Sequence, residues 1–201
     1  GVVRAGGVPR LAELRLHNGT IWSWNRPVYD AADGGHLRIE LRALPAGPTP
    51  ADMVASAALL LGLALSLRDG TDALLPALPF RLAEYNFYRA AQFGMDAPIL
   101  WPERRQQGLR ERSVVDVAGA LLGRARDGLG TLGVDDAEIE QLLGLIADRL
   151  RARQNGATWQ LDRLRQLDRE LPRDEALRQL LHEYRTWQGS GRPVHAWPLG
   201  S

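Results

Sequence analysis

The sequence predicts an α+β fold, with a short antiparallel β-meander at residues 1–48 and a mostly helical remainder at 49–201. Residues 37–42 alternate strictly between apolar and charged side chains, as expected for a strand with one apolar and one polar side. After residue 49, apolar residues recur at the spacing of helices instead. We expect both parts to belong to the same domain.

Three strands are predicted in the meander, at about 11–16, 20–29 and 36–44. The dipeptide Asn18-Gly19 between the first two is a strong hairpin signal, and the glycines at 34 and 35 mark the second turn. Pro27 indicates a bend or an edge position. Three strands cannot bury both sides of a sheet, so we expect further strands from a missing N-terminal part or from another chain.

The first helix is predicted to begin after a proline-rich connector. Thr49 is a suitable N-cap, with Pro50 at the first helical position and Asp52 at the third. Residues 50–67 are apolar nearly all round, which predicts a central, buried helix rather than a membrane span.

Amphipathic segments predict five further helices. Ser113 with Asp116 is expected to form a second capping pair, and Pro172 is expected to open the last helix. The expected ranges are about 80–93, 113–127, 135–153, 157–169 and 173–187.

The composition excludes several classes of chemistry. The net charge is +1 and no basic block occurs, which argues against nucleic-acid binding. All 25 basic residues are arginine, so a P-loop lysine and a Schiff base are excluded. The chain has no cysteine, which excludes disulfides and thiolate nucleophiles and fits a cytoplasmic protein. Its first residues suggest neither a signal peptide nor an initiator sequence, so we expect a fragment that lacks its N-terminal part.

The charged side of the third predicted strand carries Arg38, Glu40 and Arg42. Such a row is typical of an exposed sheet face whose charges pair with one another. It also suits a polyanion and metal site, in which Glu40 gives an oxygen ligand to Mg²⁺ and the arginines hold phosphate oxygens. The flanking sequence favours the second interpretation.

A connected pattern surrounds this row: His17-Asn18-Gly19-Thr20-Ile21-Trp22, Trp24-Asn25-Arg26-Pro27 and Leu44-Pro45-Ala46-Gly47-Pro48-Thr49. It resembles the C-terminal part of bacterial proteins of the glutamate–cysteine ligase family, which are γ-glutamylcysteine synthetase-like carboxylate–amine ligases. Trp159, Arg185 and the run Pro193-Val194-His195-Ala196-Trp197-Pro198 are also similar to that group. The resemblance covers nearly the whole chain.

The resemblance implies an antiparallel sheet of the glutamine-synthetase type, whose concave face binds ATP, divalent metals and an amino acid. It implies that a carboxylate is activated as an acyl phosphate, which an amine then attacks to form an amide. The expected reaction joins the γ-carboxylate of glutamate to cysteine, with ATP and Mg²⁺, in glutathione biosynthesis in the bacterial cytoplasm.

Site residues can be carried over where the motif matches. By the resemblance, Glu40 corresponds to the family's metal-binding glutamate and Arg42 to the arginine beside the nucleotide phosphates. Arg38 is expected to contribute to the same surface. Phosphoryl transfer requires positive charge and positioned metal ions more than covalent help, which agrees with these roles.

The preceding strand is expected to shape the substrate and nucleotide wall through Arg26 and Trp24, with Asn18 contacting a ligand from the turn. Each assignment has a structural alternative, because Trp24 also fits a core position and Asn18 a simple turn. Ser23 stands where an arginine is common in the family, which implies one lost contact. The family's other metal-binding carboxylates belong to an N-terminal half, so we expect this chain alone to be inactive.

Two alternatives remain open. The chain could be a non-catalytic, ligase-like interaction or assembly module, or a ligase for a different amine. We expect no membrane or nucleic-acid partner, and the missing N-terminal half is the expected partner for catalysis. Self-association into a homo-oligomer is the expected way to cover an unpaired sheet edge.

Overall fold

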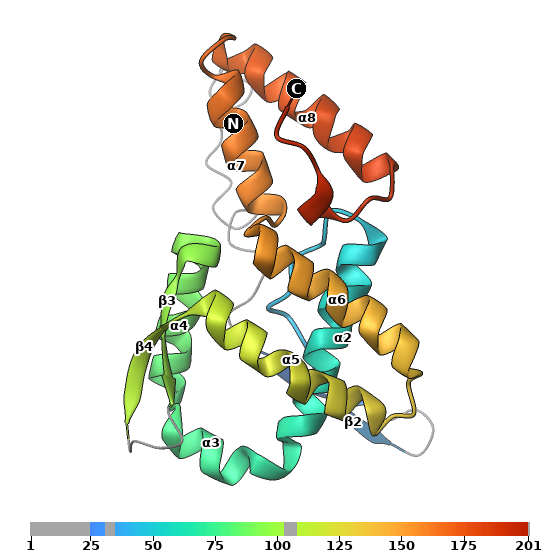
Figure 1. The fold of residues 1–201 in the computed structure, drawn as a ribbon. Coiled ribbons are helices and arrows are strands. Elements are labelled where there is room, and N and C mark those ends of the chain that lie inside the picture. Colours follow the sequence, from blue (N-terminus) through green and yellow to red (C-terminus); the bar gives the residue numbers. More distant parts are fainter. Residues whose placement is uncertain (1–24, 31–34, 103–107, 201) are drawn as a thin grey trace, which may run out of the picture. The chain divides into compact units, whose positions relative to one another are not determined.

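The structure is a computed structural model that describes residues 25–30, 35–102 and 108–200. The chain divides into two compact units, Gly1–Ala46 and Gly47–Ser201, which we describe separately. Helices and two small antiparallel sheets make up the described residues, as an α+β prediction requires (Figure 1).

The first unit contains a β-hairpin of β1 (Arg26–Asp30) and β2 (His36–Glu40). The two strands are antiparallel, and their register pairs Val28 with Arg38 and Tyr29 with Leu37. Since side chains alternate between the two sides of a strand, one side of β2 is polar and the other apolar, as the sequence predicted. The strand predicted at 11–16 lies outside the described residues.

The third predicted strand is shorter than expected. Its range was 36–44, but β2 ends at Glu40. Beyond that point, the backbone N–H of Arg42 donates to the side-chain oxygen of Asn25 at 3.1 Å. A side chain therefore supplies the acceptor that a backbone carbonyl supplies in a regular ladder.

The apolar side of the hairpin is exposed. Tyr29, Leu37 and Ile39 retain 68%, 77% and 63% of their accessible surface. A cluster of large apolar side chains is uncommon on the free surface of a soluble protein and is typical of a face that another surface covers.

The second unit begins with α2 (Pro50–Leu67), and its start is confirmed. Thr49 is the N-cap and its hydroxyl accepts from the N–H of Asp52. After α2 the chain continues through a 3₁₀ turn into α3 (Thr71–Ala77), which the sequence analysis did not predict.

The prediction that α2 is a central, buried helix is confirmed for one side of the helix only. One side, with Ala55, Ala58 and Gly62, is buried, whereas Val54 and Leu61 are about half exposed. The stretch Pro50–Ala77 also meets the length and hydropathy criteria for a membrane span, with a mean hydropathy of 1.7 and 22% of that window buried. Core helices of soluble proteins pass the same test, so this feature does not assign a location.

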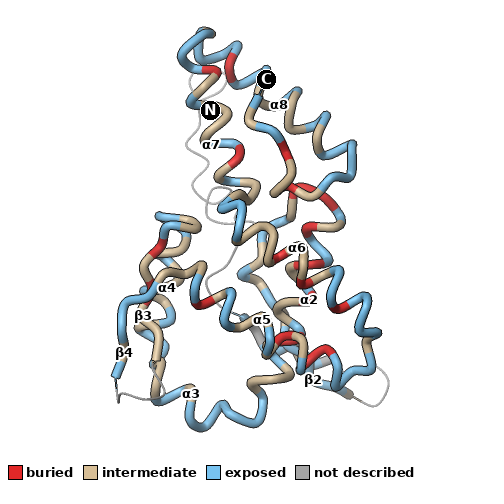
Figure 2. The backbone as a smooth tube through the Cα atoms, in the orientation of Figure 1, coloured by how far each residue is buried: buried red, intermediate tan, exposed pale blue. Residues whose placement is uncertain are grey.

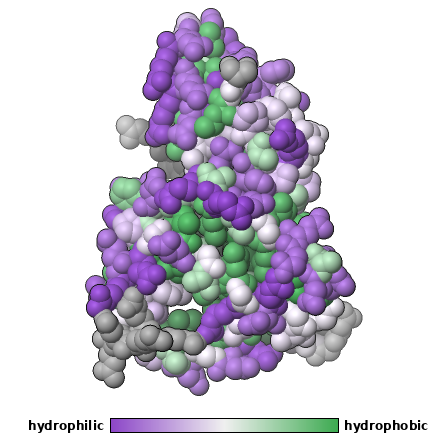
Figure 3. Space-filling view, viewed as in Figure 1, coloured by the Kyte–Doolittle hydropathy of each residue, from purple (hydrophilic) through white to green (hydrophobic). Residues whose placement is uncertain are grey.

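The main core of the second unit lies where α2 meets α5 (Val114–Gly130) and α6 (Asp136–Ala152). Figure 2 shows buried positions along the facing sides of these helices, and Figure 3 shows hydrophobic side chains in this region, flanked by hydrophilic ones. The buried members of this core are Ala58, Ala125, Leu129, Ile139 and Leu143. Small residues here allow the backbones of α2 and α5 to approach closely.

A second hairpin lies beside α4 (Phe80–Phe93) and consists of β3 (Pro98–Pro102) and β4 (Leu109–Ser113). The sequence analysis predicted α4 but missed these strands. The side-chain amide of Asn86 donates to the carbonyl of Leu100 and accepts from its N–H, both at 2.7 Å. This paired contact attaches β3 to the helix.

The capping prediction at the start of α5 is partly wrong. Ser113 is the N-cap residue, as expected, but its side chain makes no capping hydrogen bond. Ser113 also closes β4 and is the register partner of Pro98, so the strand and the helix share this residue.

The last two helices, α7 (Gly156–Leu167) and α8 (Arg173–Gly189), form a third packed region with the C-terminal segment. Trp159 and Trp197 stack edge to face, with ring centroids 5.2 Å apart. Arg163 on α7 forms a double hydrogen bond with Glu183 on α8, at 2.6 and 2.8 Å. This contact holds the pKa of Glu183 below its ordinary value, so the carboxylate stays ionised against Arg163.

We predict that Gly128→Ala destabilises the second unit. A Cβ at Gly128 would overlap the carbonyl of Gly62, and one at Gly62 would overlap the backbone of Ala125. Overpacking of this kind typically costs about 1–3 kcal/mol. The matched control is Gly123→Ala on the same helix, where an added Cβ meets nothing within 4 Å. Because alanine favours the helix over glycine, this substitution should stabilise the helix by up to about 1 kcal/mol.

Urea unfolding followed by circular dichroism compares the two variants with the wild type. We expect Gly128→Ala to lower the unfolding midpoint and Gly123→Ala to leave it unchanged or raise it. Equal midpoints for the two variants would contradict the close crossing of α2 and α5.

Candidate functional site

The charged row of the first hairpin lies along β2 and just beyond its end. The Nε of Arg42 and the Oε1 of Glu40 are 2.9 Å apart. Arg38 donates to the ring of His36, also at 2.9 Å. The structure therefore brings Glu40 and Arg42 together, as the predicted alternation requires, and places Arg38 on the same strand.

Arg42 is the most enclosed side chain of this row. It is 19% exposed, whereas Glu40 is 42% exposed. Its backbone is also held, through the hydrogen bond to Asn25. The sequence analysis did not single out Asn25, because it placed this residue inside the strand predicted at 20–29, whereas β1 begins at Arg26.

The remaining predicted site residues are only partly described. Arg26 is the register partner of Glu40, which places it at the same level of the hairpin as the predicted metal ligand. Trp24 and Asn18 lie outside the described residues. Their roles stay predictions.

The row can be tested for its fit to Mg²⁺ and a nucleotide. The described residues contain no group of three or more histidine, aspartate or glutamate side chains that could enclose a metal. Mg²⁺ in nucleotide sites usually takes one or two carboxylates and completes its octahedron with phosphate oxygens and water. A single glutamate beside arginines fits that arrangement better than a cage made of protein ligands alone.

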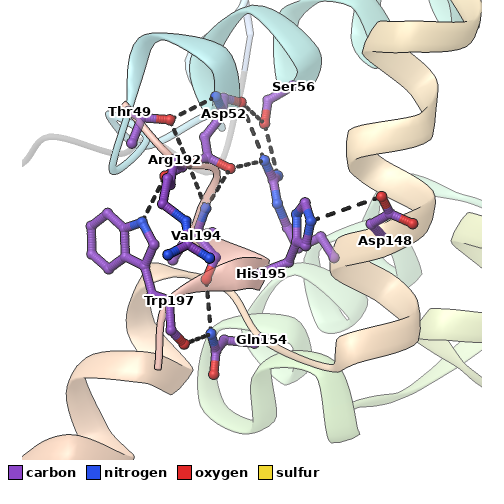
Figure 4. A network of polar contacts seen from close by, with 10 residues as sticks. Thr49, Asp52, Ser56, Asp148, Gln154, Arg192, Val194, His195 and Trp197 are labelled. Carbon is purple, nitrogen blue, oxygen red and sulfur yellow. Dashed lines mark hydrogen bonds and ion pairs between the residues drawn. The ribbon is translucent and has the colours of Figure 1, made fainter. Parts of the chain in front are cut away.

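A second polar cluster lies in the second unit, at the start of α2 (Figure 4). Asp52 is 1% exposed, yet it carries a carboxylate. That carboxylate accepts from the hydroxyl of Thr49 at 2.7 Å and from the backbone N–H of Val194 at 3.1 Å. It also accepts from Arg149 at 2.9 Å. The negative charge also helps to raise the pKa of Tyr184, although burial is the larger cause.

Arg149 joins three parts of the chain through this cluster. It lies on α6, is 15% exposed, and also donates to the hydroxyl of Ser56 at 3.1 Å. Nearby, Gln154 donates to the carbonyls of Val194 and Trp197, both at 2.8 Å. These bonds attach the C-terminal segment to the residues that follow α6, and the bond from Val194 to Asp52 attaches it to α2.

We interpret the cluster around Asp52 as structural. A buried carboxylate is costly unless charged and polar donors surround it, and three donors from separate segments do so here. The sequence analysis found the capping role of Asp52 but missed Arg149, which is 97 residues away and has no local signal.

Comparisons with known proteins give no match to a family model, to a curated protein or to a solved structure. The functional assignment therefore depends on the charged row of the hairpin and on the sequence pattern around it. The family resemblance and the metal role of Glu40 remain proposals.

We predict that Arg149→Met strongly destabilises the second unit, because it leaves the charge of Asp52 buried without its cation. Breaking a buried ion pair in this way typically costs about 3–5 kcal/mol. Arg151→Met is the matched control, since this arginine on the same helix is 76% exposed and its ion pair is with the partly exposed Asp148. Its loss should cost less than about 1 kcal/mol.

Chemical unfolding in urea provides the measurement for both variants. The cluster holds the unit together if Arg149→Met loses several times more stability than Arg151→Met. Similar small losses in the two variants would show that Asp52 and Arg149 contribute little.

Proposed function

We propose that this protein acts as an ATP- and Mg²⁺-dependent carboxylate–amine ligase, which joins the γ-carboxylate of glutamate to cysteine. The observation that carries the proposal is the contact of Glu40, the last residue of β2, with Arg42 just beyond the strand, which also carries Arg38. The motifs that flank this strand support the same function. In this proposal the N-terminal half supplies further metal ligands.

The arginines act on the phosphates. A planar guanidinium can hold two phosphate oxygens at once, and it remains charged at every working pH. Arg42, enclosed and fixed at both its backbone and its side chain, is suited to stabilise the γ-phosphoryl group as it leaves ADP. Arg38 adds a second positive charge on the same strand.

Glu40 is proposed to hold the metal. Bound Mg²⁺ would neutralise charge on the β- and γ-phosphates. The glutamate contributes one carboxylate, and Arg42 keeps that carboxylate oriented in the structure described here. Removing the carboxylate should therefore weaken nucleotide binding more than it weakens folding.

The proposed reaction has two steps. An oxygen of the glutamate γ-carboxylate attacks the γ-phosphorus of ATP, and ADP leaves as an acyl phosphate forms. The amine of cysteine then attacks the acyl carbon, and phosphate leaves as the amide forms and the amine releases a proton. We propose that Arg26, Trp24 and Asn18 help to line the substrate wall. The charged row acts on phosphate and metal, and the choice of cysteine as the amine follows from the family resemblance.

A non-catalytic interaction module is the second candidate. The exposed apolar side of the hairpin, with Tyr29, Leu37 and Ile39, favours this candidate because such a surface is suited to another protein surface. The two candidates differ in a measurable way. A module that only assembles has no need to bind Mg-ATP.

We predict that full-length protein binds Mg-ATP and that Glu40→Gln and Arg42→Ala each weaken this binding at least tenfold. A charge-assisted hydrogen bond contributes about 1.5–3 kcal/mol, which corresponds to roughly ten- to a hundredfold in affinity. Titration calorimetry gives the affinity. Arg178→Ala, which removes an exposed arginine on α8, is the control for a general loss of positive charge.

Two results would contradict the proposal. If wild-type protein does not bind Mg-ATP, the ligase function fails and the interaction module is favoured. If binding is tight and unaffected by either substitution, the charged row is only a solvated sheet face.

A further inference from the structure

The end of the first hairpin contains a contact that regular strand pairing does not produce. Glu40 and its partner Arg26 form the last pair of the ladder. Arg42 lies two residues further on, and its backbone N–H donates to the side-chain oxygen of Asn25 at 3.1 Å. The amide of Asn25 therefore extends the pairing of the two chain segments past the last backbone pair.

This contact acts on the residue that the proposed reaction needs most. The guanidinium of Arg42 is oriented by Glu40 at 2.9 Å, whereas its backbone is oriented by Asn25. The direction of a side chain depends on the position of its Cα, so both contacts are needed to fix the charge in space. A displacement of about 1 Å in such a group can cost on the order of a hundredfold in rate.

Asparagine is suited to this position because its side-chain amide resembles a peptide group and can accept in the same geometry. The Oδ1 of Asn25 accepts here as a backbone carbonyl would in a longer ladder. An asparagine directly before β1 can therefore hold the neighbouring segment without a longer strand.

We infer that Asn25 is a positioning residue for Arg42 and that it acts on turnover through the backbone of that arginine. The inference rests on the proposed ligase function. Asn25 itself touches neither phosphate nor metal in this account. It keeps the guanidinium of Arg42 in place while the phosphoryl group is transferred.

Two substitutions of Asn25 distinguish the effect of its accepting oxygen from the effect of its side-chain size. Asn25→Asp keeps the shape and the accepting oxygen, whereas Asn25→Leu keeps a similar size but has no acceptor. We expect Asn25→Leu to lower kcat for amide formation by roughly ten- to a hundredfold and to change the KM for ATP much less. Asn25→Asp should retain most of the wild-type kcat. Thermal unfolding of both variants checks that the fold is retained.

Arg42→Ala completes the experiment as a double-mutant cycle in the full-length protein. If Asn25 acts through Arg42, adding Asn25→Leu to Arg42→Ala should cause little further loss of kcat. The cycle distinguishes positioning from a merely structural role. A general weakening of the hairpin by Asn25→Leu would lower kcat further, in addition to the loss caused by Arg42→Ala.

The outcomes distinguish this inference from the function on which it rests. If Arg42→Ala loses turnover while Asn25→Leu does not, the inference is wrong and the ligase function stands. The inference is also wrong if Asn25→Asp lowers kcat as much as Asn25→Leu does. Additive losses of kcat from Asn25→Leu and Arg42→Ala would equally contradict it. If the wild type forms no amide, the proposed function fails and the inference fails with it.

Discussion

The ion pair between Asp52 and Arg149 is the constraint on which the second unit depends. It lies at the start of α2, and it joins that helix to α6 and to the C-terminal segment through Val194. Burying a carboxylate requires donors from several directions, so these three segments must come together for any one of them to be stable. The close crossing of α2 and α5 adds a second requirement, because it allows no side chain at Gly128.

The charged row of the first unit is held in a different way from the buried ion pair. The contacts described for Arg42 include Glu40, two residues away, and Asn25, which lies directly before the pairing strand. Glu40 is 42% exposed and can change partners when a ligand arrives, whereas Asp52 is 1% exposed and cannot leave Arg149 without local unfolding. This difference is why we place the function on the hairpin and treat the buried cluster as structural.

Local signals in the sequence predicted most of the helices and the alternation in β2. Thr49 and Pro50 set the start of α2, and Pro172 set the start of α8, because each acts within a single turn. The hairpin of β3 and β4 was missed because both strands are only five residues long, and β3 begins and ends with proline. The partnership of Asp52 with Arg149 had no local signal. Of the candidate site, the adjacency of Glu40 and Arg42 was predictable, but the support from Asn25 was not.

Isotope transfer tests the ligase function most directly. Full-length protein would be given Mg-ATP, cysteine and glutamate with ¹⁸O in its γ-carboxylate, and the released phosphate would be analysed by mass spectrometry. An acyl phosphate intermediate requires one labelled oxygen to pass from the carboxylate to phosphate for each amide formed, and that is the result we predict. Amide formation with unlabelled phosphate, or no amide at all, would contradict the account.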